Sequence, residues 1–206
     1  MITKFKIFEN FDSTASMWDD FIYKVNTGII PKDSPDIKNI SKLIRMNPTG
    51  SVLDISVGDG AHSEYFINQG YDVYGTDISP LAIKTIEDKY PKQTWVVHDT
   101  EKRFPFSDNK FDIIFARLAI HYFSKESLSN ILEDIHRMLK PNGTFFMMVK
   151  ITNKGNLDTG KKQYTEEEWI NLVNVNFDIN DINIETRKAY SFEKTTSNLL
   201  EIFAKK

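Results

Sequence analysis

Ser51-Val-Leu-Asp-Ile-Ser-Val-Gly-Asp-Gly60 is the stretch that decides the predicted fold of this chain. Its first half has the apolar character of a short buried strand, and its second half is a tight turn with glycines at 58 and 60. A helical pattern follows, and the next strand ends on Asp77. Glycines let ligand atoms approach the backbone, a helix N-terminus holds negative groups, and a carboxylate accepts hydrogen bonds from a ribose diol. The stretch and its continuation therefore predict a nucleoside-binding site.

Around this stretch the sequence alternates between strand and helix patterns. Strands are predicted at 51–56, 72–77, 94–98, 111–116 and 143–150, and helices at 61–69, 79–89 and 124–139. Such alternation predicts a parallel sheet with helices on both faces. The nearly continuous apolar runs at 113–116 and 145–149 are typical of central strands, and 140–143 (Lys-Pro-Asn-Gly) is a predicted turn.

The segments on either side of this core differ from it. Residues 1–46 predict a helical cap, with one helix that begins at Ser13 or Ser16 and runs through Val25, and a second at about 36–45. Residues 151–206 predict a polar loop (151–164), a helix at about 165–175 that opens with a capping box, and an antiparallel hairpin. We therefore expect one domain over 1–206, divided into a cap (1–46), a cofactor-binding core (47–150) and a substrate loop with the hairpin (151–206).

Composition narrows the class of protein. The chain has 206 residues and a net charge of −3, which does not favour a nucleic-acid-binding protein. It has no cysteine, which excludes disulfides and thiolate chemistry, and its histidines lack metal-site spacing with nearby acids, so we predict no metal. It shows no signal peptide and no apolar run long enough for a membrane span, so we expect a soluble, cytoplasmic protein. Nothing in the sequence indicates an oligomeric state.

Two cofactors compete for the glycine turn. A dinucleotide fold has a third glycine at position 63, where this chain has Ser63. Asp54 lies before the turn, inside the first strand, and Asp99 follows the third strand. A C-terminal hairpin is also not the natural end of a fold built from two mirrored nucleotide halves. These features favour S-adenosylmethionine over a dinucleotide.

Five stretches resemble the class I S-adenosylmethionine-dependent methyltransferases, in order and at that family's spacing. They are VLDISVGDG (52–60), GTDIS (75–79), VHDTEKRFPFSDNKFD (97–112), AIHYF (119–123) and LKPNGT (139–144). The resemblance covers about residues 50–150 and is greatest to small-molecule enzymes of the tellurite-resistance or ubiquinone-biosynthesis type. It implies a Rossmann-like, doubly wound α/β sheet of seven strands whose last strand is antiparallel. The family has glycine where Ser56 stands and a small residue where Val57 stands, so this turn departs from the pattern.

The resemblance also implies which residues bind the donor. Asp54 is expected to accept from its ammonium group, Asp77 from the ribose diol and Asp99 from the adenine amine. Ile78 is expected to pack on the adenine face. The full set of cofactor-binding residues predicted is Asp54, Ser56, Val57, Gly58, Gly60, Asp77, Ile78, Asp99, Thr100 and Arg117.

The acceptor side is less defined by the sequence. His121 and Tyr122 come just after the fourth strand, and His121 is a candidate general base because a histidine pKa suits neutral pH. Correct alignment of the nucleophile supplies much of the rate of such a transfer without a base. Trp18, Phe21 and Tyr23 on the first helix are candidates for an aromatic lid or for core packing.

The predicted function is transfer of a methyl group from S-adenosylmethionine to a nucleophile on a small molecule, with release of S-adenosylhomocysteine. Three alternatives remain open. The first is an RNA or protein methyltransferase, and the second is a nicotinamide-dependent oxidoreductase. The third is a non-catalytic cofactor-binding or interaction module, which the irregular Ser56–Val57 turn keeps open.

Overall fold

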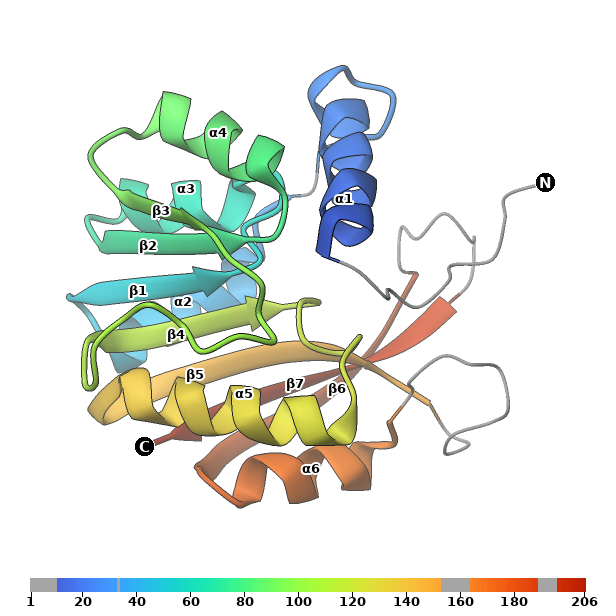
Figure 1. The fold of residues 1–206 in the computed structure, drawn as a ribbon. Helices are drawn as coiled ribbons and strands as arrows, with labels where there is room; N and C mark the ends of the chain where they lie inside the picture. Colours follow the sequence, from blue (N-terminus) through green and yellow to red (C-terminus); the bar gives the residue numbers. More distant parts are fainter. Residues whose placement is uncertain (1–10, 33, 153–163, 189–195) are drawn as a thin grey trace.

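A seven-stranded sheet with helices on both faces forms the centre of the molecule (Figure 1). The computed structural model describes residues 11–32, 34–152, 164–188 and 196–206. Its strands are β1 (Ser51–Ile55), β2 (Asp72–Asp77), β3 (Thr94–Val97), β4 (Phe111–Arg117), β5 (Leu139–Ile151), β6 (Asp178–Lys188) and β7 (Thr196–Lys205). Its helices are α1 (Phe11–Asn26), α2 (Ile37–Met46), α3 (Ala61–Asn68), α4 (Pro80–Lys89), α5 (Lys125–Met138) and α6 (Glu166–Asn174).

The strand order is β3-β2-β1-β4-β5-β7-β6. The first five strands pair in parallel, whereas β7 runs antiparallel to both β5 and β6. The order reverses at β1, which lies between β2 and β4, and open α/β sheets bind ligands at such a switch point. The predicted doubly wound sheet with an antiparallel last strand is therefore confirmed.

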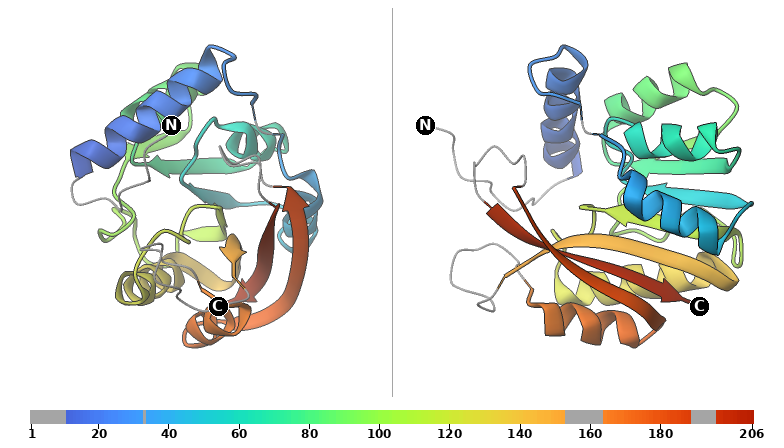
Figure 2. Two further views of the ribbon diagram at one scale, coloured as in Figure 1. Left: turned by 90° about the vertical axis from the view of Figure 1, so that its right-hand side faces the viewer. Right: turned by 180° about the vertical axis from the view of Figure 1, so that it is seen from behind.

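Each face of the sheet has its own apolar core. Successive side chains of a strand point to opposite faces, so Leu53 and Ile55 join one core while Val52 joins the other. The core that contains Leu53 is completed by α5 and α6, with Trp169 fully buried in it. The opposite core is completed by α2 and α3 through Leu43 and Phe66 (Figure 2).

Two boundaries differ from the sequence prediction. β5 begins at Leu139, so the predicted turn at 140–143 lies inside the strand. Leu139 pairs with Phe111 and Thr144 with Ile113, and the register shift between these pairs accommodates the extra residues, with Asn142 at φ 65°. A long-range pairing thus overrides local turn chemistry. The first helix begins at Phe11, ahead of both predicted caps.

Several smaller predictions are confirmed. Thr165 and Glu168 form the capping box at the start of α6, and Ser79 caps α4 with Pro80 at its first position. The second helix, predicted at about 36–45, is α2, and Asp36 is its N-cap. The lysines of the predicted substrate loop, Lys154, Lys161 and Lys162, lie outside the described residues.

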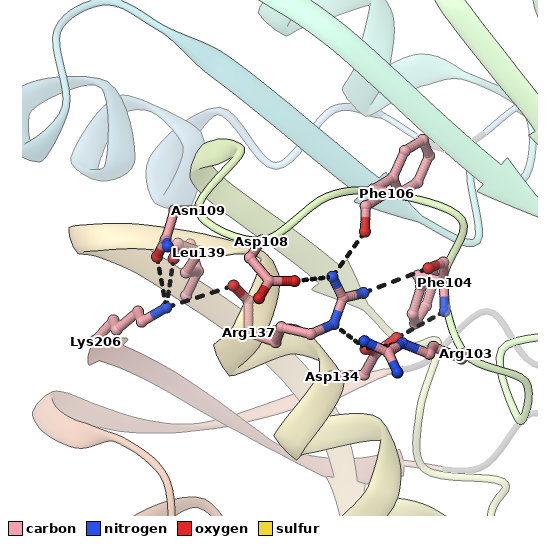
Figure 3. A network of polar contacts seen from close by, with 9 residues as sticks. All are labelled: Arg103, Phe104, Phe106, Asp108, Asn109, Asp134, Arg137, Leu139 and Lys206. Carbon is pink, nitrogen blue, oxygen red and sulfur yellow. Dashed lines mark hydrogen bonds and ion pairs between the residues drawn. The ribbon is translucent and has the colours of Figure 1, made fainter.

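A polar network ties the β3–β4 connection to the end of α5 (Figure 3). Arg137 donates to Asp134 and to Asp108, each at 2.6 Å, and to the Phe106 carbonyl at 2.7 Å. Asp134 also accepts from the Phe104 backbone N–H at 2.6 Å. The connection that carries Asp99 and Thr100 is thereby fixed to the body of the domain.

No helix in the described part of the chain is both long and apolar enough to cross a membrane.

Candidate active site

The predicted site residues gather at one end of the sheet, called here the carboxyl edge, which is formed by the C-terminal ends of the parallel strands. In Figure 1 the arrowheads of β1, β2 and β4 point toward this edge, and α1 stands beside it. Asp77 ends β2 and Arg117 ends β4, while Asp54 is the penultimate residue of β1. Residues as far apart in the sequence as Asp54 and Arg117 therefore lie at the same end of the sheet.

The turn after β1 contains three residues with left-handed backbone. Ser56, Gly58 and Gly60 have φ values of 62°, 59° and 80°. A side chain at Gly58 would meet only the Ser56 carbonyl oxygen, at 4.0 Å, so the space above this backbone is open. A Cβ at Gly60 would lie 2.6 Å from Cδ1 of Ile86 on α4. Gly58 therefore offers a bare backbone to a ligand, whereas Gly60 is favoured by its φ of 80° and by the nearby end of the Ile86 side chain.

Ser56 occupies the left-handed backbone conformation that favours glycine. A non-glycine residue in this region is strained by about 1 kcal/mol or more. Serine at position 56, where the family has glycine, therefore destabilises the folded protein through backbone strain.

Val57, which stands where the family has a smaller residue, is accommodated by space over the neighbouring strand β2. Val57 is 3% exposed, and its backbone N–H donates to the Thr76 carbonyl at 3.0 Å. A Cβ at Gly75 would lie 2.5 Å from Cγ2 of Val57 and 2.5 Å from Trp95. Because Gly75 has no side chain, the branched Val57 fits over β2. Sequence analysis missed this compensation, although Gly75 lies in one of the matched stretches.

Asp77 joins the glycine turn to the start of α4. Its carboxylate accepts from the backbone N–H groups of Gly58 and Ser79, both at 2.9 Å. The side chain is 8% exposed, and burial raises its pKa against the lowering effect of these two hydrogen bonds. Ile78, partly exposed, follows directly. The structure thus places the predicted ribose acid next to the bare backbone at Gly58.

Asp54 is a second buried carboxylate at this edge. It is 3% exposed and accepts from the Ser63 hydroxyl at 2.6 Å. Burial raises the pKa of Asp54 to about 7; the Ser63 hydrogen bond lowers it, and the Asp77 carboxylate raises it further. In the sequence Ser63 is notable only because a dinucleotide fold has glycine there, and no local pattern indicates its hydrogen bond to Asp54.

Asp99 and Thr100 lie beyond the tip of β3, beside β2. Asp77 pairs with Val97 across the sheet, and the next N–H along, that of His98, donates to the Asp77 carbonyl at 2.8 Å. The Asp99 side chain accepts from the Glu101 N–H at 3.0 Å, and Thr100 is buried. Both residues are therefore within the same part of the edge as Asp77.

Arg117 lies on the other side of the switch point. Its Nε is 3.8 Å from Oδ2 of Asp36, the residue that caps α2. Its charge also lowers the pKa of Asp54. Arg117 thus places a positive charge among the acids of this edge.

His121 and Tyr122 lie on the loop after β4. His121 is 7% exposed, and among the described residues neither of its ring nitrogens has a hydrogen-bond partner. Burial, with a smaller contribution from Lys150, lowers the pKa of His121 to about 3, so its ring is neutral at physiological pH. The same loop begins with Leu118 at φ 55°, an unusual value for a large side chain.

The first helix approaches this loop through its aromatic residues. The ring centroids of Trp18 and Tyr122 are 6.1 Å apart, and those of Trp18 and Phe21 are 5.8 Å apart, both edge to face. Tyr23 is 57% exposed and belongs to neither contact. Of the three aromatic residues predicted as a lid or as packing, Trp18 therefore contacts the loop after β4, and Phe21 packs against Trp18.

A polar cavity of about 310 Å³ lies elsewhere, at the amino edge of the sheet. It is lined by His136, the residues from Asn174 to Asp178, Lys205 and Lys206. None of the predicted site residues lines this cavity, so the cavity is not part of the candidate active site.

Part of this chain is similar to known proteins. Residues 53–147, from β1 to β5, match the family model described as a methyltransferase domain. An uncharacterized methyltransferase of Synechocystis is 31% identical over 105 residues, which are 51% of this chain and 49% of that protein. The chain therefore spans about half the length of this curated relative.

Solved structures share the fold over more of the chain. The [4+2]-cyclase SpnF aligns with a TM-score of 0.75 at 14% identity, covering 100% of this chain and 99% of its own. A Burkholderia thailandensis 1,6-didemethyltoxoflavin-N1-methyltransferase, solved with its substrate and S-adenosylhomocysteine, aligns with a TM-score of 0.69 at 18% identity, covering 99% and 93%. At these identities the similarity concerns the fold alone, and that fold serves more than one reaction.

Proposed function

We propose that this chain, which belongs to the class I methyltransferases by its fold and its matched segment, transfers a methyl group from S-adenosylmethionine to a nucleophile on a small molecule. One observation carries the proposal: the open backbone of Gly58 lies beside the buried carboxylate of Asp77, which accepts from it. An adenosine group needs an apolar wall, an acceptor for its diol and room along the main chain. Ile78, Asp77 and Gly58 offer these together.

The nucleoside end of the donor is assigned to β2 and β3. Asp77 would accept from the ribose hydroxyls and Ile78 would pack on the adenine ring. Asp99 would accept from the adenine amine, and the backbone of Thr100 would face the ring. Their shared position at the tips of neighbouring strands supports this division of roles.

The amino-acid end of the donor is assigned to β1 and β4. Asp54 would bind the ammonium group through the turn that contains Ser56, Val57, Gly58 and Gly60, and Arg117 would face the carboxylate. An ionised carboxylate buried like Asp54 destabilises the folded protein, because burial raises its pKa. A group kept at such a cost at a ligand-binding edge favours a functional role.

The donor, when bound, supplies a methyl group on a sulfonium that is already activated for attack by a nucleophile. The chain would orient the acceptor beside Tyr122 and exclude water under α1. With a pKa of about 3, His121 does not suit the general-base role expected from the sequence. It would only accept a hydrogen bond from the nucleophile, whose proton would pass to water on methyl transfer. Tyr122, 41% exposed, would form part of the acceptor wall.

The acceptor is proposed to be a small molecule, bound beside the loop after β4 and α1. The bound substrate of the Burkholderia relative supports this choice for the fold. The alternative of a different reaction in the same fold has one specific observation in its favour, the similarity to a [4+2]-cyclase. Methyl transfer is preferred because the matched segment is a methyltransferase domain.

Calorimetric titration tests the proposal directly. S-adenosylhomocysteine and S-adenosylmethionine are expected to bind with micromolar affinity, and NAD is expected not to bind. Incubation with labelled donor and a panel of small nucleophiles should then yield a product heavier by one methyl group. Absence of binding by either sulfur compound would refute the assignment. Binding without transfer to any acceptor would favour the non-catalytic or cyclase-like alternative.

A further inference from the structure

The first helix makes a contact that no part of the proposed mechanism uses. Asp19 on α1 accepts from the Ser79 hydroxyl and, at 3.1 Å, from the Leu81 backbone N–H. Both donors belong to the first turn of α4, where helices leave N–H groups without partners inside the helix. Ser79 already caps this turn by accepting from the Ala82 N–H at 3.0 Å. A carboxylate from α1 therefore caps the same helix a second time.

Ser79 connects this contact to the proposed donor site. Its backbone N–H donates to Asp77 at 2.9 Å, and Asp77 also accepts from Gly58. A chain of hydrogen bonds thus runs from Asp19 through Ser79 to Asp77 and the glycine turn. The charge of Asp19 acts on Asp77 as well, because it contributes to the raised pKa of that carboxyl. The clamp from α1 therefore holds the segment that would bind the ribose and the adenine.

The helix continues from this clamp across the edge of the sheet. Asn26, two turns after Asp19, donates to the Thr85 hydroxyl at 3.1 Å, so α1 and α4 lie side by side. Trp18, the neighbour of Asp19, lies edge to face with Tyr122 on the loop after β4. Figure 1 and the left view of Figure 2 both place α1 against α4, at the edge where the strand arrowheads end. The helix therefore connects the donor half of the site to the acceptor half.

We propose that α1 is a lid whose docking is coupled to donor binding, and that Asp19 is the positioning residue that couples them. The inference rests on the proposed function, because the coupling acts through the donor. A docked α1 fixes Ser79 and thereby the orientation of Asp77, so the donor meets a preorganised site. The effect is reciprocal: if docking strengthens donor binding, the donor must strengthen docking by the same factor.

Hydrogen exchange and calorimetry together test the coupling on the full chain. In the wild-type protein, S-adenosylhomocysteine should slow amide exchange in α1. Asp19→Ala should weaken S-adenosylhomocysteine binding about fivefold to tenfold, because only part of the energy of a charge-assisted hydrogen bond is transmitted to the donor, and should reduce the slowing in α1. Asp19→Asn keeps an accepting oxygen and should lose about twofold to threefold.

Two matched variants separate coupling from other effects. Asp20 is exposed and pairs with Lys24 on the same helix, so Asp20→Ala should leave the affinity for S-adenosylhomocysteine unchanged. Asn26→Ala removes a docking contact without touching the α4 cap, and should weaken binding about twofold. If Asp19→Ala acted only by uncapping α4, Asn26→Ala would have no effect on donor affinity.

The outcomes are distinct. Unchanged affinity in Asp19→Ala, or α1 exchange that is the same with and without S-adenosylhomocysteine, would overturn the lid while leaving the proposed function intact. No binding by the wild-type protein would instead refute the proposed function, and the coupling with it. Circular dichroism of Asp19→Ala checks that the domain remains folded.

Discussion

The two ends of the β1–β4 strand pair hold their charges in opposite ways. At the carboxyl end, Asp54 is buried beside Asp77, and burial raises the pKa of both acids. At the amino end, burial alone would raise the pKa of Asp112, but the Lys140 ammonium at 2.8 Å and the Ser51 N–H lower it below its usual value. At the amino end, the charge of Asp112 is balanced by Lys140 and the Ser51 N–H. At the carboxyl end, Asp54 and Asp77 are buried carboxylates whose negative charge is not fully balanced by the protein.

The backbone shows the same contrast. Left-handed residues at the amino end are Asn109 and Asn142, and asparagine tolerates this region better than other side chains. At the carboxyl end they include Ser56 and Leu118, for which it is more strained. Strain and unfavourable charge therefore concentrate at the proposed site, where local rules of stability are expected to give way to function.

The largest expected effect is on the free energy of unfolding, which should change in opposite directions when Asp54 on β1 and Asp112 on β4 are replaced by asparagine. Since the pKa of Asp54 is higher in the folded than in the unfolded protein, stability falls as pH rises from about 4 to about 7. Asp54→Asn should therefore raise the free energy of unfolding by about 2–4 kcal/mol at pH 8 and change it little at pH 4.

Asp112→Asn is the matched variant for this prediction. It removes the ion pair with Lys140 and should lower stability by about 1–2 kcal/mol at pH 8. Because the pKa of Asp112 is lowered on folding, this contribution is present at neutral pH and is lost in acid. Urea unfolding at both pH values measures the two changes. Destabilisation by both variants at pH 8 would contradict the contrast between the two ends.

Asp77→Ala should affect ligand binding more than folding. The variant should lose donor affinity by roughly tenfold or more, because a charge-assisted hydrogen bond contributes about 1.5–3 kcal/mol. Calorimetry with S-adenosylhomocysteine measures the loss, and thermal unfolding without ligand checks the fold. Unchanged affinity would remove Asp77 from the site and with it the main support for the proposed function.

Arg137→Ala tests how much the polar network around Arg137 contributes to stability. Arg137 is 17% exposed at its side chain and joins Asp134, Asp108 and the Phe106 carbonyl (Figure 3). Its loss should lower stability by about 1–3 kcal/mol in urea unfolding, because Asp134 would remain partly buried without its cation.

Arg103→Ala is the control for Arg137. Arg103 is 76% exposed and 3.9 Å from Asp134, so its removal should change stability by less than about 0.5 kcal/mol. Equal losses in the two variants would mean that the network is only a surface feature.

The smallest expected effect concerns backbone strain. Ser56→Gly should stabilise the protein by about 0.5–1 kcal/mol, since relief of the left-handed strain exceeds the added flexibility of the unfolded chain. Asn142→Gly, at a similar φ, should change stability by less than about 0.5 kcal/mol. Thermal unfolding of both variants gives the difference. A stabilisation at position 142 as large as that at 56 would show that strain is not concentrated at the carboxyl edge.

The fold could be predicted because its signals are local. Apolar periodicity, the capping residues and the position of Asp77 after its strand all lie within short stretches, and the structure places them as expected. The edge that carries the site follows from the rule that carboxyl ends of parallel strands meet. Most of the predicted donor residues therefore share that edge.

What the sequence did not predict depends on contacts between distant residues. Val57 fits only because Gly75 lies opposite it on the next strand, and β5 begins early only because Leu139 pairs with Phe111. The clamp from Asp19 to Ser79 spans sixty positions, and no local pattern indicates it. The positive φ of Ser56 could likewise not be predicted, because serine seldom adopts it.

The position of β7 between β5 and β6 has a consequence for synthesis of the protein. During translation β6 leaves the ribosome before its only neighbour in the sheet exists, and the free side of β5 stays open for the same interval. Nascent chains should therefore present an unpaired strand edge until residues 196–205 emerge, and such edges invite pairing with other chains. Slow translation over residues 178–205 is then expected to lower the yield of native protein, although no contact of the finished molecule has changed.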